Sequence, residues 1–174
     1  MSAEAAAAAA HLRRAAARER LKDVPVPKTS AKLRRMRALI GEAAADGGKV
    51  VVLPGFPEVL DAVREALGTF APVTAGTPPG RRREIADAFA AASGHAVLPA
   101  EIGVDGLDPR GASMVIVCEP QEDPDLAAAM IGRVHGAGRA GPLLVHRLVA
   151  PGTVDERVAD DPARVIRDER SAGS

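Results

Sequence analysis

Two short apolar runs constrain the fold more than any other feature of this sequence. Residues 49–53 read K-V-V-V-L, and residues 114–118 read M-V-I-V-C. Neither run alternates apolar with polar residues, which is typical of strands that are covered on both faces in parallel sheets. Neighbouring parallel strands need a crossover connection, which is usually a helix. The two runs therefore predict an α/β domain.

Helical patterns surround these runs and complete a βαβα rhythm. Ser30 is placed to cap the first helix, and Gly47-Gly48 is placed to end it. The expected helices cover residues 31–46, 57–68, 80–92 and 123–135, and the remaining expected strands cover residues 72–75, 95–98 and 143–149. We therefore expect a mostly parallel sheet with helices on both faces.

The ends of the chain differ from this central domain. Residues 1–49 hold 11 Lys/Arg and 5 Asp/Glu, whereas the remaining residues hold 12 and 18. We expect residues 1–28 to form a basic, Ala-rich helix with a Pro-containing linker, residues 29–160 to form the domain, and residues 161–174 to form a charged flexible tail. A basic arm of this kind binds either nucleic acid or the acidic body of its own chain.

Composition excludes several classes of function. Aromatic residues make up 2% of the chain, with no Trp or Tyr, so binding of nucleic acid by stacking platforms is excluded. The single cysteine, Cys118, allows no disulfide within the chain. The four histidines lack metal-ligand spacing, so no metal site is expected. No apolar run approaches the ~20 residues of a membrane span, and the start of the chain lacks the plan of a secretory signal. We therefore expect a cytoplasmic protein without a membrane partner, and association with a nucleoid is compatible with this.

Seven short phrases occur in a characteristic order. They are S-A-K-L at 30–33, F-x-x-x-L-D at 56–61, G-T-P at 76–78 followed by Arg82 and Phe89, a Gly-containing loop at 103–108, a strand ending in Glu-Pro at 115–120, G-R-x-H at 132–135, and H-R-L-V-A-P-G-T-V-D-E-R at 146–157. In the last phrase, Thr153 and Glu156 also form a T-x-x-E capping box that predicts a helix.

In this order and spacing, the segment from about Ser30 to Val158 resembles the second, C-terminal RecA-like lobe of Swi/Snf-type helicase-like DNA translocases of helicase superfamily 2. The resemblance implies a RecA-like sheet. It also implies nucleotide contacts from Gly103, Gly106, Arg133 and Arg139, and DNA contacts from Gly76, Thr77, Arg81, Arg82 and Arg83.

The sequence departs from the family where the chemistry is concentrated. It has no G-x-x-x-x-G-K-[ST] loop, which the first lobe of such motors supplies. In the family phrase Q-A-x-G-R-x-H-R-x-G-Q, the second arginine is replaced by Gly136. Pro54 and Pro99 remove backbone N–H donors, and Asp105 adds negative charge. We therefore expect no catalytic residue, and ATP and Mg²⁺ only in a pair with a separate first lobe.

Two interpretations of the arginines remain open. Arg133 is either a nucleotide contact or a cation that favours a helix C-terminus. Residues 81–83 form either a DNA-binding cluster or a solvated helix face. The first functional hypothesis is a stand-alone, degenerate second lobe that binds DNA or a first-lobe ATPase and does not hydrolyse ATP alone. The alternatives are a non-catalytic protein-interaction or regulatory module derived from that lobe, and a folded fragment without activity.

Overall fold

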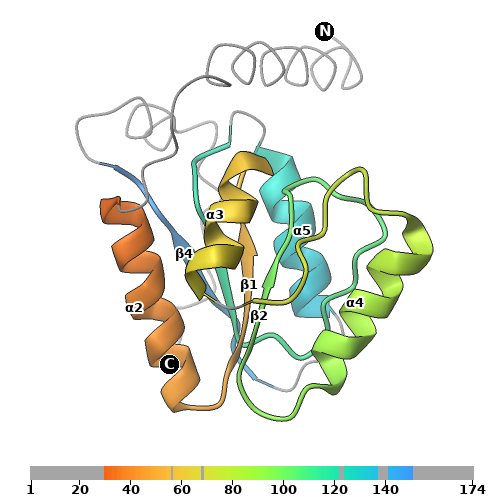
Figure 1. Cartoon of the computed structure of the whole chain (residues 1–174), viewed down its shortest axis with the longest axis horizontal. Coiled ribbons are helices and arrows are strands. Elements are labelled where there is room, and N and C mark those ends of the chain that lie inside the picture. The colour runs from red at the N-terminus through yellow and green to blue at the C-terminus, as the bar shows by residue number, and fades with distance from the viewer. Residues whose placement is uncertain (1–29, 56, 68, 122–123, 137–140, 151–174) are drawn as a thin grey trace, which may run out of the picture.

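Four parallel strands form the centre of the domain (Figure 1). The computed structural model of the chain describes residues 30–55, 57–67, 69–121, 124–136 and 141–150. The strands are β1 (Lys49–Leu53), β2 (Ala96–Pro99), β3 (Met114–Val117) and β4 (Leu144–Arg147). They lie in the order β2-β1-β3-β4, and all three pairings are parallel. The two apolar runs thus form adjacent central strands, in which Val51 pairs with Val115.

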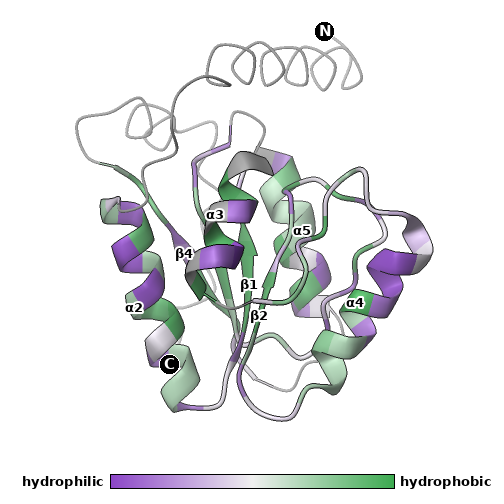
Figure 2. Cartoon of the chain, in the orientation of Figure 1, coloured by the Kyte–Doolittle hydropathy of each residue, from purple (hydrophilic) through white to green (hydrophobic). Residues whose placement is uncertain are grey.

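Helices cover both faces of this sheet, as the sequence predicts (Figures 1 and 2). Successive strand residues point to opposite faces. Val50 and Val52 belong to the core cluster formed with α2 (Ala31–Ala45) and α3 (Pro57–Leu67). Val51 and Leu53 belong to the cluster formed with α4 (Pro79–Ala91) and α5 (Pro124–Gly136). The apolar, doubly covered strands of the sequence therefore correspond to a three-layer α/β domain.

The ends of α2 show how local sequence sets an element. The Ser30 hydroxyl accepts a hydrogen bond from the Leu33 N–H at 3.1 Å, which caps the first turn. At the other end Gly47 has φ 65°, a conformation that costs a residue with a Cβ more than it costs glycine. The Gly48 N–H then donates to the Ala43 carbonyl at 2.7 Å. Together these contacts confirm the predicted cap and stop.

Two predicted strands are shorter in the structure. Residues 72–75 form only an isolated parallel bridge between Val73 and Ala100. The Val73 N–H and carbonyl both pair with the backbone at the end of β2 and just after it, but the next donor on that side, the Ala75 N–H, donates to the Glu101 carboxylate at 2.9 Å instead of a backbone carbonyl. The last strand covers Leu144–Arg147 rather than 143–149. Predictions for residues 1–28, Thr153, Glu156 and residues 161–174 lie outside the described residues. Within the part of the chain that is described, no helix combines the length and apolarity that crossing a membrane requires.

Candidate functional site

The carboxyl ends of the strands carry most of the residues that the sequence singles out. In parallel sheets the loops after the strands meet at this edge, where ligands bind. Pro54-Gly55 follows β1, residues 100–108 follow β2, and residues 118–121 follow β3. Residues 73–75 run alongside the end of β2, since the Glu101 N–H donates to the Val73 carbonyl at 2.8 Å.

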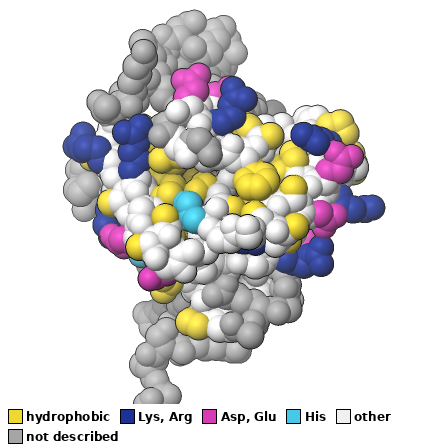
Figure 3. Space-filling model, turned by 60° about the horizontal axis from the view of Figure 1, so that its bottom comes forward, with side chains coloured by type: hydrophobic (Ala, Val, Ile, Leu, Met, Phe, Trp, Pro, Cys, Tyr) yellow, Lys and Arg dark blue, Asp and Glu magenta, His cyan; other side chains and the backbone are white. Residues whose placement is uncertain are grey.

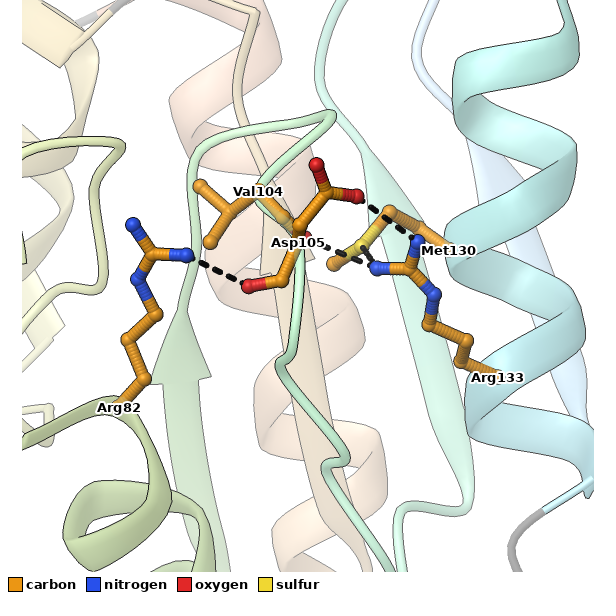
Figure 4. A network of polar contacts seen from close by, with 5 residues as sticks. All are labelled: Arg82, Val104, Asp105, Met130 and Arg133. Carbon is orange, nitrogen blue, oxygen red and sulfur yellow. Dashed lines mark hydrogen bonds and ion pairs between the residues drawn. The ribbon is translucent and has the colours of Figure 1, made fainter. Parts of the chain in front are cut away.

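The loop of residues 103–106 lies between two arginines, one from each helix on that face (Figure 4). Arg82 of α4 donates to the Asp105 carbonyl at 2.6 Å. Arg133 of α5 donates to the Val104 carbonyl at 2.9 Å and to the Asp105 carboxylate at 3.2 Å. One residue of each predicted set, the DNA-binding and the nucleotide-binding, therefore contacts the same loop.

Glycines give this loop its bend. Gly103 and Gly106 have φ values of 86° and 70°, which glycine adopts readily. A Cβ at position 103 would also come within 3.4 Å of the Leu126 side chain of α5. Buried side chains at Ile102 and Val104 attach the loop to the core. These glycines therefore have a structural role that does not depend on a nucleotide.

Arg82 joins three backbone segments. Besides the Asp105 carbonyl, its guanidinium donates to the Thr77 carbonyl at 2.7 Å and to the Ala75 carbonyl at 2.8 Å. The Thr77 hydroxyl in turn accepts a hydrogen bond from the Thr74 N–H at 2.9 Å. The turn that contains Gly76 and Thr77 is thus fixed to α4 and to the loop of residues 103–106.

The other two arginines of the predicted DNA-binding set are exposed. Arg81 forms an i,i+3 ion pair with Glu84 at 2.8 Å, with 58% of the arginine side chain exposed. Arg83 is exposed one residue beyond Arg82. Figure 3 turns the lower side of the domain forward, the side at which the strands begin, and basic and acidic side chains are interspersed there around an apolar centre. Basic side chains therefore do not form one continuous surface there.

Arg133 reaches the loop from the last turn of α5. Its side chain is 38% exposed, whereas that of its partner Asp105 is 89% exposed. The position suits a cation, because the carbonyl end of a helix carries partial negative charge. The guanidinium contacts both the loop backbone and a carboxylate of that loop. Arg139, the other arginine predicted at a nucleotide, lies outside the described residues.

Two carboxylates at this edge received no role from the sequence, although Glu119 belongs to the Glu-Pro phrase. Glu119 accepts a hydrogen bond from the Gly55 N–H at 2.6 Å, and Glu101 accepts one from the Ala75 N–H at 2.9 Å. A Cβ at position 55 would lie 2.8 Å from the Gln121 Nε2 atom, so a larger residue there would displace the end of that side chain. The available signal was positional, since both glutamates follow the ends of parallel strands.

Cys118 is a buried residue rather than a reactive one. Burial raises the pKa of its thiol well above the usual value, the Glu119 carboxylate raises it further, and Lys32 opposes the shift. Lys32 also donates to the Cys118 carbonyl at 3.0 Å. The protonated thiol is a poor nucleophile. Among the residues with described positions, no three His, Cys, Asp or Glu side chains are grouped as metal ligands would be.

Curated proteins with similar sequences include a chromatin-remodeling ATPase, a DNA repair and recombination protein and an E3 ubiquitin-protein ligase. No family model matches the chain. The chromatin-remodeling ATPase INO80 of Cryptococcus neoformans is 27% identical over 135 residues, 74% of this chain and 8% of that protein. The DNA repair and recombination protein RDH54 of Saccharomyces cerevisiae is 28% identical over 137 residues, 74% of this chain and 15% of that protein. The human E3 ubiquitin-protein ligase SHPRH is 37% identical over 62 residues, 36% of this chain and 4% of that protein.

Solved structures with similar folds include two C-terminal ATPase lobes. The C-terminal part of the Fun30 ATPase domain matches with a TM-score of 0.70 and 19% identity, over 75% of this chain and 44% of that chain. The Sulfolobus solfataricus SWI2/SNF2 ATPase C-terminal domain matches with a TM-score of 0.55 and 20% identity, over 74% of this chain and 54% of that chain.

The fold is therefore that of a RecA-like α/β lobe. Together with the curated sequences, it supports a C-terminal lobe of a Swi/Snf helicase-like protein, which confirms the resemblance in the sequence motifs. The chain spans less than a fifth of the length of each of the three curated relatives described.

Proposed function

We propose that this chain acts as a degenerate second lobe of a Swi/Snf-type ATP-dependent DNA translocase. It binds DNA or a partner first lobe, and it does not hydrolyse ATP alone. The observation that carries the proposal is the convergence of Arg82 and Arg133 on the loop of residues 103–106, in a fold that matches a C-terminal ATPase lobe with a TM-score of 0.70.

The described residues do not fit ATP and Mg²⁺ by themselves. Phosphoryl transfer needs a phosphate-cradling loop, acidic residues for the metal and cations at the γ-phosphate. This sequence has no such loop, and Gly136 stands where the family phrase has its second arginine. Arg133 is engaged with the Val104 carbonyl and the Asp105 carboxylate. These features support a role in which any hydrolysis requires a first lobe.

ATPase measurements test this part of the proposal. The purified chain is assayed with and without duplex DNA, and we expect no turnover above the background of a heat-denatured sample. In a second set of assays, a separately produced first lobe from a Swi/Snf-type ATPase is added to the chain. Sustained DNA-stimulated turnover by the chain alone would refute the proposal.

The first turn of α4 supports DNA binding. It contains Arg81 and Arg82, with Arg83 next, and no acidic residue, although cations are unfavourable at a helix N-terminus. Bound phosphate would offset that cost. Because Arg82 holds three backbone carbonyls, the informative variant is the double substitution R81A/R83A, which leaves Arg82 in place.

Fluorescence anisotropy with labelled duplex DNA across a KCl series measures this contribution. The matched control is R64A/R147A, which removes two exposed arginines from α3 and β4. Loss of two phosphate contacts should lower the magnitude of the log-affinity versus log-salt slope by about two. If R81A/R83A and R64A/R147A behave alike, α4 does not contact DNA.

A second candidate function is a protein-interaction module. Glu119 and Glu101 accept hydrogen bonds from the Gly55 and Ala75 N–H groups. This favours the second candidate, because those two backbone donors are then less available to a DNA phosphate. Wild-type protein that shows neither salt-dependent DNA binding nor a complex with a first lobe would remove the first function and favour this candidate.

A further inference from the structure

Three carboxylates occupy hydrogen-bond donors at the carboxyl edge of the sheet. Glu119 accepts from the Gly55 N–H at 2.6 Å, and Glu101 accepts from the Ala75 N–H at 2.9 Å. Asp105 accepts from Arg133 at 3.2 Å. The three donors come from the loop after β1, the turn before α4 and the end of α5. The turn before α4 and the end of α5 contain residues that the sequence assigns to DNA or nucleotide contact, and the loop after β1 lies at the same edge of the sheet.

Donors of this kind are the ones that hold phosphate. Backbone N–H groups and arginine side chains make most phosphate contacts in nucleic-acid complexes. A carboxylate resembles phosphate as an acceptor, because it is anionic, offers paired oxygens and forms charge-assisted hydrogen bonds. One N–H group cannot form a full-strength hydrogen bond to a carboxylate and to a phosphate at the same time.

We propose that Glu101, Asp105 and Glu119 are specificity-determining residues that act as internal surrogates for phosphate. An external polyanion reaches this edge only by displacing them, so their charge sets the affinity of the edge for DNA. The inference rests on the proposed function in that it assigns DNA contact to this same edge, and it adds which residues regulate that contact.

The environment of each carboxylate predicts an order of effect. The Glu119 contact is the shortest of the three, and it is part-buried. Glu101 is half-buried, whereas 89% of the Asp105 side chain is exposed to competing water. Neutralising Glu119 should therefore increase affinity for DNA most, and neutralising Asp105 least.

A charge-matched pair of variants tests the competition. The triple substitution E101Q/D105N/E119Q retains amide oxygens as neutral acceptors, which bond less strongly than carboxylates. The control, E42Q/E65Q/D87N, removes three exposed carboxylates from α2, α3 and α4 and changes the net charge equally. Any long-range effect of net charge is therefore common to both.

Binding of a labelled duplex DNA is followed by anisotropy over a KCl series. We expect the triple variant to bind about tenfold more tightly than the control, the factor expected for losing competition at a charge-assisted hydrogen bond. Equal affinities for the triple variant and the control overturn the inference.

A second measurement covers the case in which the triple variant does not fold. D105N leaves the backbone contacts of Val104 and Asp105 to the two arginines in place. With inorganic phosphate as the probe, its melting temperature should rise more than that of wild type or D87N, since a ligand that binds only the folded state stabilises it. Equal rises in the three proteins overturn the inference.

These outcomes separate the inference from the proposed function. DNA binding by the triple variant but not by wild type supports the inference and removes DNA binding from the function of the natural chain. ATP turnover by wild type alone refutes the proposed function, and the comparison of triple variant with control still decides the inference.

Discussion

Replacing Arg82 with methionine tests whether this arginine is a structural clamp. Methionine keeps an unbranched, largely apolar stem and lacks the guanidinium. The substitution therefore removes the hydrogen bonds to the carbonyls of Ala75, Thr77 and Asp105 with little change in packing. Those bonds connect the turn before α4 with the loop of residues 103–106.

The magnitude follows from the exposure of the three bonds. The bond to the Thr77 carbonyl is part-buried, and the other two are exposed. A hydrogen bond to a charged group contributes about 1.5 kcal/mol when it is shielded, and exposed ionic contacts contribute about 0.2–0.5 kcal/mol each. The expected loss in the free energy of unfolding is therefore about 2 kcal/mol. For a chain of this length, that lowers the melting temperature by about 4–8 °C.

Urea unfolding followed by circular dichroism measures the loss directly. The matched control is R81M, which removes the neighbouring guanidinium from an ion pair whose two side chains are 58% and 67% exposed. We expect the control to lose about 0.5 kcal/mol or less. Equal unfolding midpoints for R82M and R81M would refute the reasoning, because the clamp would then contribute no more than a surface pair.

Three further predictions, made with four substitutions, rest on burial and backbone geometry. G47A should destabilise the chain by about 1 kcal/mol, because φ at Gly47 is 65°. G41A should stabilise it by about 0.5–1 kcal/mol, because no atom lies within 4 Å of the added Cβ in this helix. Thermal melts compare the two variants. F89A should cost about 3–5 kcal/mol in urea unfolding, since Phe89 is fully buried and packs edge-on against Phe70 at 6.0 Å. Because the pKa of Cys118 is raised in the folded chain, only the unfolded thiol ionises just above its usual pKa of about 8.5. The thiol's contribution to the free energy of unfolding is therefore full below about pH 8.5 and falls above it. Unfolding of C118A should lack this decline.

The strands and caps were predictable because their signals are local. The apolar runs at 49–53 and 114–118 needed only their own composition to indicate doubly covered strands, and Ser30 needed only its place before an amphipathic pattern. The register that places Val51 beside both Leu98 and Val115 follows from burying these strands together. Residues 72–75 formed less strand than predicted, since the Ala75 N–H bonds to the Glu101 side chain rather than to the backbone of the neighbouring segment.

The contacts at the carboxyl edge were not predictable in the same way. Arg82 and the Asp105 carbonyl are 23 residues apart, and Gly55 and Glu119 are 64 apart. A hydrogen bond from a side chain to a distant backbone group does not affect the periodicity of the sequence, because the backbone partner can belong to any type of residue. The sequence placed Arg82 in a DNA-binding cluster, whereas the tertiary structure shows that its donors reach three carbonyls.

At the end of α5, the two arginines of the family phrase have two different physical roles. Arg133 donates to the Val104 carbonyl at 2.9 Å, and this bond to the backbone supports the loop of residues 103–106 without a ligand. The second arginine of the phrase, replaced here by Gly136, would add positive charge for a transferring phosphoryl group. Losing the second therefore removes charge stabilisation and leaves the support of the loop intact. A lobe that retains Arg133 and has glycine at position 136 keeps the support of this loop, and this is the physical basis for our proposal of binding rather than hydrolysis.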